Sequence, residues 1–456
     1  MADGSSDVRM NPDSHTSIEH GQSYRDAFGQ MQPAASGAPW LQVLRERALE
    51  EFIGRGFPTT AEEDWRYTDL TRVAQRSFDY LDGAPQERLE DYGGIVEKQG
   101  LRLPNMHALV FVNGIYQPDY SPSGTLPNGV YVSRFNNLVE QQTEWLEHGL
   151  GAIADIGDWH LAALNTAFLN DGVILVTDNN KQLTETLYVL NIAVGQKTTV
   201  QPRLLISLGR GSSATVVEHY LSTGPSFTNA ITEIHCGPGA QLEYCKLQQE
   251  HESAFHLAAQ HVRLDEDSRF HGVNVDLGGQ LSRNDLQVEL RGNGAETTLH
   301  GLFMAQGNAH IDNHTLLDHA APHCMSREDY RGVLADKARG IFNGKVLVQI
   351  GAQKTDAELQ SRNLLLSAGA EINTKPELEI YADDVKCSHG ATTGQLDKDA
   401  MFYLRAKGIS QLEARDMLVA AFTRVIIEQI DSAELREPVA AAVAQRLGHA
   451  DLEPLS

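Results

Sequence analysis

The segment from Tyr381 to His389 contains the residues best suited to carry chemistry. In an extended chain, alternation places Val385, Cys387 and His389 on one face of the strand. A thiolate and an imidazole two residues apart can both reach one soft metal centre, as zinc and iron–sulfur ligands do. A cysteine also serves as a small core side chain, and a strand histidine as a hydrogen-bonding group. The pair by itself therefore leaves metal ligation and a structural role open.

Two ligands do not complete a tetrahedral metal site, which takes four. The others must come from distant residues or from another chain. The reserve within this chain consists of His310, His314, His319, His323 and Cys324. His310 and His314 would share a face only on a helix, whereas the Asn and Asp residues around them favour strand and turn. We therefore predict a structural or surface role for this group.

Other chemistry is disfavoured by the same local geometry. Cys387 and His389 would run parallel on a strand, which does not suit a nucleophile and its base. Asp383 and Asp384 would point to opposite faces, against paired-carboxylate hydrolysis. The segment Gly340–Val346 resembles a phosphate-binding loop, but it has three residues between its glycines, and valine stands where Ser or Thr would contact Mg²⁺. We expect no catalytic residue and no ATP or NAD site.

Short strands between about Leu187 and Leu396 must position these residues. They show period-two patterns separated by turns that contain glycine. Gly211, Gly239 and Gly294 mark three such turns. The second interval is close to twice the first, and the turn missing from it would fall near positions 265–268. A period of about 28 residues favours a parallel β-solenoid, whose coils bury their apolar faces on one another. A β-sandwich or barrel, with more closely spaced turns, is the alternative.

Helical patterns flank the strands. Ser410 and Glu413 form a capping box ahead of a broad apolar helical face. A second helix is predicted from about Ala433 to Leu447, ending at Gly448. These two helices must pack on the solenoid or on a partner protein, and the sequence leaves both open. The predicted divisions are a mobile tail with room for a helical segment (1–38), a helical and mixed N-terminal domain (39–160), the β core (161–397) and a C-terminal helical domain (398–456).

Composition argues against several classes of protein. The 456 residues are 41% hydrophobic and 21% charged, which is ordinary for a globular protein. The net charge of −24 repels nucleic-acid backbones and anionic membranes. Four cysteines without a CxxC motif make no disulfide framework, and the chain shows neither a secretory signal nor an apolar run of ~20 residues. We expect a cytoplasmic protein with no nucleic-acid or membrane partner.

Distinctive segments lie along most of the chain. From Tyr330 onward they are Tyr330–Leu334, Ile341–Lys345, Ala352–Ala357, Asn363–Ser367, Thr374–Ile380, Asp383–Leu396 and Met401–Arg405. Upstream they are Glu63–Thr68, Phe111–Gly114 and Leu164–Phe168. These segments resemble the SufB/SufD family of the SUF iron–sulfur cluster assembly system, and the upstream ones resemble the family's N-terminal domain. The resemblance covers the chain beyond its N-terminal tail.

This resemblance implies a mainly β protein: a right-handed parallel β-helix between helical N-terminal and C-terminal domains. It implies a non-catalytic scaffold that pairs with a SufB-type paralogue through the β-helix and binds a SufC-type ABC ATPase through its C-terminal helices. A cysteine desulfurase would deliver sulfur to the complex. A transient iron–sulfur cluster would form at the shared interface, with His389 as a ligand and Cys387 close by. The partner chain would then supply the missing ligands.

The residues around His389 separate two branches of this family. A SufB-type chain is expected to carry an acidic residue on each side of the histidine, whereas Ser388 and Gly390 flank it here. The resemblance therefore favours the SufD branch, with SufB as the main alternative. A cytosolic β-helix enzyme acting on carbohydrate would need a ladder of carboxylates or bases along one solenoid face, and we predict none. Cluster type, homodimer formation, reduced-flavin binding and the role of the tail stay open.

Overall fold

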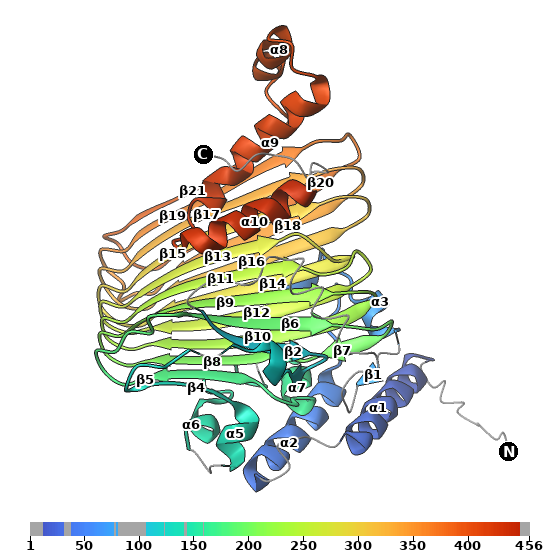
Figure 1. Cartoon of the computed structure of the whole chain (residues 1–456), viewed down its shortest axis with the longest axis vertical. Helices are drawn as coiled ribbons and strands as arrows, with labels where there is room; N and C mark the ends of the chain where they lie inside the picture. Colours follow the sequence, from blue (N-terminus) through green and yellow to red (C-terminus); the bar gives the residue numbers. More distant parts are fainter. Residues whose placement is uncertain are drawn as a thin grey trace, which may run out of the picture.

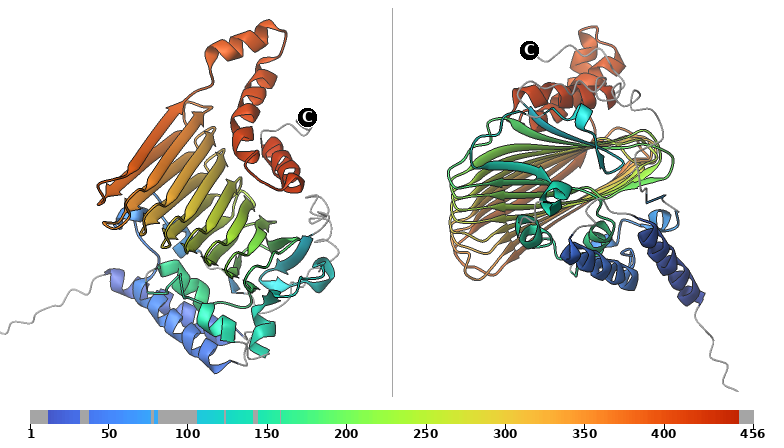
Figure 2. Two further views of the ribbon diagram at one scale, coloured as in Figure 1. Left: turned by 90° about the vertical axis from the view of Figure 1, so that its left-hand side faces the viewer. Right: turned by 60° about the horizontal axis from the view of Figure 1, so that its bottom comes forward.

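Two long parallel β-sheets, stacked face to face, form the body of the molecule (Figure 1). The structure is a computed structural model and describes residues 12–31, 38–76, 79–80, 106–122, 124–140, 144–157 and 159–446. Helices from the N-terminal part lie at one end, and helices from the C-terminal part lie along and beyond the other (Figure 2). The predicted fold class, a parallel β-solenoid core flanked by helices, is confirmed.

From residue 203 onward, successive strands alternate between the two sheets. Sheet A contains, in order, β4 (Val130–Arg134), β5 (Val173–Thr177), β8 (Arg203–Leu208), β10 (Ser226–Cys236), β12 (Phe255–Leu264), β14 (Leu281–Leu290), β16 (His310–His319), β18 (Arg339–Val348) and β20 (Glu371–Ile380), with β1 (Asp79–Tyr80) and β7 (Thr198–Val200) off this path. Sheet B contains β3 (Ile115–Tyr116), β2 (Met106–Val112), β6 (Thr186–Ala193), β9 (Ser213–Ser222), β11 (Gln241–Gln249), β13 (Arg269–Asp276), β15 (Glu296–Ala305), β17 (Met325–Leu334), β19 (Asp356–Leu365) and β21 (Lys386–Gly394). The pairs β2–β3 and β4–β5 are antiparallel, and the others are parallel.

The strand register repeats at the interval that the glycines predict. Leu208 pairs with Cys236, and Cys236 pairs with Leu264, so that the length of each coil equals the interval from Gly211 to Gly239. The next coil is slightly shorter, since Leu264 pairs with Leu290, and the last coil is longer, since Val348 pairs with Ile380. Because partners in a parallel ladder face the same side, one inward-facing position repeats along the whole solenoid and builds a continuous apolar core.

One turn of each coil contains a residue in the left-handed backbone region. The φ angle lies between 53° and 72° at Asn180, Gly211, Gly239, Asp267, Gly294, His323 and Lys354. The amide of each donates to a carbonyl of the next coil, as from Gly239 to Glu266 at 2.7 Å. Glycine adopts this conformation at little cost, and Asn and Asp tolerate it. The regularly spaced glycines in the sequence therefore mark this column of left-handed turn residues. Asp267 occupies the column at the turn that lacks a glycine, where the sequence predicted one near positions 265–268.

Helices α2 and α7 cover the outer face of sheet A at the N-terminal end, where they pack on Phe227 and Phe255. Tyr24 and Phe28 of α1 join them through Phe168, with ring centroids 6.2 Å apart in both pairs. Helix α1 falls within the range predicted as a tail, whereas residues 1–11 and 32–37 lie outside the described residues. The helices of this region are α1 (Pro12–Gln30), α2 (Pro39–Arg55), η1 (Glu63–Trp65), α3 (Thr71–Ala74), η2 (Pro118–Tyr120), α5 (Phe135–Glu140), α6 (Glu144–Gly149) and α7 (His160–Ala167).

The C-terminal arm comprises α8 (Lys398–Ala406), α9 (Gln411–Ile427) and α10 (Ala433–Arg446). The predicted capping box at Ser410 is present. Helices α9 and α10 pack on the outer face of sheet B, where Val419 and Ile426 are fully buried against strand residues such as Leu302. The solenoid is thus the packing partner of these two helices. Helix α8 protrudes and buries none of its residues (Figure 2). The predicted cap at Gly448 lies outside the described residues.

No helix in the described part of the chain has both the length and the apolar character that crossing a membrane requires.

Candidate metal centre at the end of the solenoid

Cys387 and His389 lie on β21, the last strand of sheet B. In the parallel ladder with β19, Cys387 is the partner of Ala357 and His389 is the partner of Leu359. Ala357 and Leu359 are buried in the solenoid core. Because register partners face the same side, Cys387 and His389 share the strand face expected from alternation, and this face is the interior side of the last coil.

The two side chains differ in their surroundings. Cys387 is half-buried and packs against the core beside Val385 and Leu378, whereas His389 is exposed. Burial raises the pKa of the Cys387 thiol, the charge of Asp356 adds to the effect, and a backbone hydrogen bond with Ala357 opposes it. The thiol is therefore protonated at neutral pH, and a metal ion must displace its proton in order to bind.

The solenoid ends in two free strand edges, close to this pair. In the described part of the chain, no strand pairs with the outer edge of β20 in sheet A or of β21 in sheet B. Such edges present unpaired backbone N–H and C=O groups. Pro376 removes one donor from β20, which is typical of an edge strand. The edge of β21 contains no proline. A second chain added at this end would therefore lie directly over Cys387 and His389.

The reserve histidines of the outer face have separate structural roles. His310 Nε2 lies 2.8 Å from Thr68 Oγ1 and so joins sheet A to the N-terminal region. His314 Nε2 lies 3.0 Å from Asp312 Oδ1. Asp312 is fully buried and also accepts a hydrogen bond from Thr68 at 2.5 Å. This arrangement fastens the segment around Thr68 to the solenoid.

The remaining reserve residues, His319, His323 and Cys324, also have positions within the solenoid structure. His319 is buried inside the solenoid, where its Nε2 lies 2.9 Å from Ser326 Oγ. His323 occupies the left-handed turn column, with φ of 60°. The buried Cys324 thiol donates to the Gly292 carbonyl over 3.3 Å. Among the described residues, none of these five belongs to a group of three possible metal ligands, and their contacts are consistent with the predicted structural or surface role.

The outer face of sheet A contains a groove of about 590 Å³ that the sequence did not predict. We expected no ladder of charged residues on a solenoid face, yet this groove is lined by Asp285, Lys345, Lys375, Glu377 and Glu379, among others. The solenoid period could have revealed it, because Asp285, His314, Asn343 and Lys375 occupy one register column.

Each of three groove carboxylates is paired with a cation. Asp285 pairs with Arg283 at 2.8 Å, Glu379 pairs with Lys345 at 2.8 Å, and Glu377 pairs with Lys375. Glycoside hydrolysis needs one carboxyl group that holds a proton and a second that attacks or activates water. These three paired carboxylates do not supply that combination.

Two family models match the chain along most of its length. One is described as the SUF system FeS cluster assembly, SufBD core domain, and matches residues 191–422, which include Cys387 and His389. The other is the SufBD protein N-terminal region, which matches residues 18–189. The chain belongs to the SufBD family. The resemblance seen in its motifs is thereby confirmed, and SufBD proteins take part in iron–sulfur cluster assembly by the SUF system.

Individual SufBD relatives match over nearly the full length. The chain is 34% identical to an iron–sulfur cluster assembly SufBD family protein of Synechocystis over 87% of this chain and 89% of the relative. It is 32% identical to the iron–sulfur cluster assembly protein SufD of Escherichia coli, over 88% and 92% of the two chains. The SufD of Bacillus subtilis is 24% identical over 95% of this chain and 99% of its own.

Proposed function

We propose that this SufBD protein is a SufD-type scaffold subunit on which a transient iron–sulfur cluster forms together with a SufB-type partner. The proposal rests on the position of Cys387 and His389 at the open end of the solenoid. These two residues are suitable ligands for a cluster, but two ligands are too few to hold one. A second chain at this end of the solenoid can supply the others. Similarity to the two SufD proteins supports this branch over SufB, as do the neutral flanking residues Ser388 and Gly390.

The free edges of β20 and β21 support pairing with a SufB-type solenoid. Strands of a partner added to these edges would satisfy their backbone hydrogen bonds and continue the sheets into the second chain. The same contact would cover Cys387 and His389 and surround them with the partner's ligands. A cluster assembled there would be shared between both subunits. A cysteine desulfurase would act as sulfur donor to the complex, and the four free thiols suit a cytoplasmic location.

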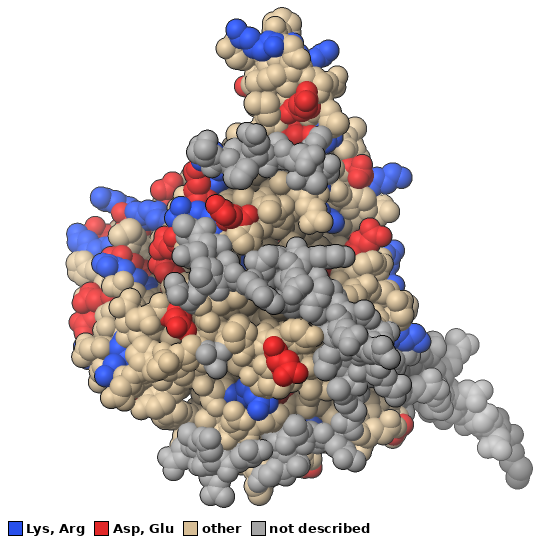
Figure 3. Space-filling model, in the orientation of Figure 1, with Lys and Arg blue, Asp and Glu red and all other residues tan. Residues whose placement is uncertain are grey.

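The protruding part of the C-terminal arm supports binding of a SufC-type ATPase. Phe402 is 74% exposed and Tyr403 is 61% exposed on α8, which has no buried residue. Figure 3 shows Lys and Arg side chains at the tip of this protrusion. Exposed aromatic residues on a projecting helix mark a protein-binding surface. ATP-driven dimerisation of the ATPase would move α8 and, through α9, the solenoid, while this subunit itself catalyses no reaction.

The test is co-expression of the chain with a SufB-type partner and the ATPase, followed by purification of the complex. His389→Ala should lower the bound iron and sulfide and the visible cluster absorbance severalfold, because one ligand of the shared site is lost. The complex should still assemble, since His389 is exposed and supports no core contact. Ser388→Ala is the matched control, on the opposite face of the same strand. Unchanged cluster content in the His389→Ala complex would refute the proposal. Flavin fluorescence of the same samples measures whether the complex holds a reduced flavin.

A further inference from the structure

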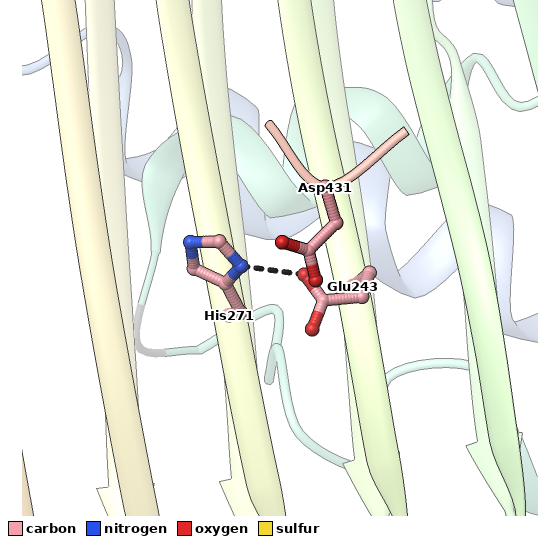
Figure 4. Close-up of side chains that lie close together, drawn as sticks. All are labelled: Glu243, His271 and Asp431. Atoms are coloured by element: carbon pink, nitrogen blue, oxygen red, sulfur yellow. Dashed lines mark hydrogen bonds and ion pairs between the residues drawn. The ribbon is translucent and has the colours of Figure 1, made fainter. Parts of the chain in front are cut away.

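Three side chains converge where the C-terminal arm crosses sheet B, several coils away from the strand that carries Cys387. They are Glu243 on β11, His271 on β13 and Asp431 in the turn between α9 and α10 (Figure 4). One imidazole nitrogen and two carboxylate oxygens all lie within 4.8 Å of one another. Within the group, His271 Nδ1 lies 2.5 Å from Glu243 Oε2.

The fold fixes this meeting point from two directions. Glu243 and His271 are register partners in adjacent coils, so their Cα positions are neighbours in the sheet. They lie on the outer face, because the preceding residues Leu242 and Phe270 point into the core. On the arm, Ile430 immediately precedes Asp431 and is buried against sheet B. The apolar packing of the arm thus holds the Asp431 carboxylate over the two strand residues.

The charges at this point favour a bound cation. Burial alone would lower the pKa of His271, but the hydrogen bond and the charge of Glu243, with the charge of Asp431, raise it above its ordinary value. His300 packs edge-on against His271 with ring centroids 5.5 Å apart. Burial lowers the pKa of His300 to about 4, so that this ring stays neutral. Arg436 is directed elsewhere, donating to the backbone carbonyls of Ile430 and Asp431.

We propose that Glu243, His271 and Asp431 bind a first-row divalent metal ion, which fastens the C-terminal arm to the solenoid. One imidazole and two carboxylates suit ions such as Mn²⁺, Fe²⁺, Co²⁺ and Zn²⁺. Glu243 and His271 are half-buried and Asp431 is exposed, so water can complete the coordination. Binding releases any proton held by His271. The three ligands come from three separate segments, so the ion cross-links the arm to two coils.

Titration of the full-length chain with Co²⁺ tests the binding, because Co²⁺ gives visible absorption bands that report its ligands. The parent protein carries Cys387→Ser and His389→Ala, so that the proposed cluster site cannot contribute. It should bind Co²⁺, and Glu243→Gln or Asp431→Asn should each weaken the affinity about 10-fold or more. Asp265→Asn is the matched control: it alters the His235–Asp265 pair at 3.1 Å, which belongs to no group of three ligands among the described residues. The control should bind like the parent.

Hydrogen exchange tests the fastening separately. Co²⁺ should slow amide exchange in α10 of the parent severalfold and leave the Asp431→Asn variant unchanged. Asp431→Asn preserves the shape of an exposed side chain, so the variant is expected to fold, and its thermal unfolding verifies this. A parent that binds no Co²⁺, or variants that bind it equally well, would overturn the site. Binding without any slowing of exchange in α10 would overturn the fastening. Neither result depends on the cluster site, which the parent lacks.

Discussion

Glu328 and His389 occupy one column of inward-facing positions, separated only by Leu359. His389 is exposed at the open end, whereas Glu328 is 3% exposed inside the solenoid. The Thr315 hydroxyl donates to Glu328 Oε1 at 2.7 Å, and no described group is a partner of Oε2. Burial raises the pKa of Glu328 to about 8. Two coils beneath the proposed cluster site, the solenoid therefore keeps a neutral carboxyl group.

Glu328→Gln is expected to stabilise the protein at alkaline pH and to change little at acid pH. Glu328 has a folded-state pKa near 8 against an ordinary value of 4.5. Between these values the unfolded chain loses the proton that the folded chain keeps, so the wild-type free energy of unfolding falls as pH rises. Glutamine does not ionise and avoids this loss, which should amount to about 4 kcal/mol at pH 8. Denaturant unfolding at about pH 4 and pH 8 measures the difference.

The exposed neighbour Glu358 offers the control for this experiment. It lies on the outer face of β19 and is open to solvent, so Glu358→Gln should show no comparable pH-dependent gain. If Glu328→Gln differed from wild type by the same amount at both pH values, the protonated state of Glu328 would be disproved.

The regular part of this fold could be predicted from sequence because one backbone requirement repeats. Each coil needs a left-handed residue at one turn, and glycine meets that need at Gly211, Gly239 and Gly294. Alternation likewise predicts the shared face of Cys387 and His389. Their different exposure could not be predicted, since it depends on where the last coil ends and what lies over it.

Sequence patterns could not predict where the C-terminal arm packs or which polar contacts it makes. The apolar face of α9 indicates burial but does not name the surface that it meets. The interval between Glu243 and His271 is one solenoid period, and this signal was available in the sequence. Asp431 lies outside the repeat, in a helix–helix turn, so only the docked arm brings it to the other two residues.

Cys387 should be the one cysteine that reacts with a thiol reagent in the native protein. Cys236, Cys245 and Cys324 are buried, and burial raises the pKa of Cys236 and Cys245 to about 12. A disulfide reagent should titrate about one thiol in the folded chain, and all four cysteines after unfolding. Because the pKa of Cys387 is also raised by burial, the native reaction should be slow at neutral pH and faster as pH rises.

Two serine variants identify the reactive thiol. Cys387→Ser should abolish the native reaction, whereas Cys245→Ser should leave it intact, because Cys245 lies in the cluster beneath α9 and α10. A native reaction that persists in Cys387→Ser would contradict the assignment.

His323→Gly should stabilise the solenoid, and His323→Val should destabilise it. His323 has φ of 60°, and its amide donates to the Gln353 carbonyl at 2.9 Å. Glycine keeps this hydrogen bond without the steric cost, for a gain of up to about 1 kcal/mol, whereas valine should cost about 1–2 kcal/mol. Chemical denaturation measures both. Met325→Gly, in the neighbouring strand, is the control and should destabilise, since glycine weakens a strand interior. Loss of stability in His323→Gly would disprove strain at this turn.

Phe402→Glu should prevent binding of the proposed ATPase without affecting the fold. Phe402 lies on α8, which buries none of its residues, so the free energy of unfolding should stay within about 0.5 kcal/mol of wild type. An aromatic anchor at the centre of an interface contributes about 2 kcal/mol or more, so the affinity for the ATPase should fall about 30-fold or further. Surface-immobilised ATPase and calorimetry measure the affinity. Val43→Glu, at a residue 64% exposed on α2, is the matched control at the opposite end of the molecule and should bind normally. Normal binding by Phe402→Glu would show that the ATPase does not dock on this face of α8.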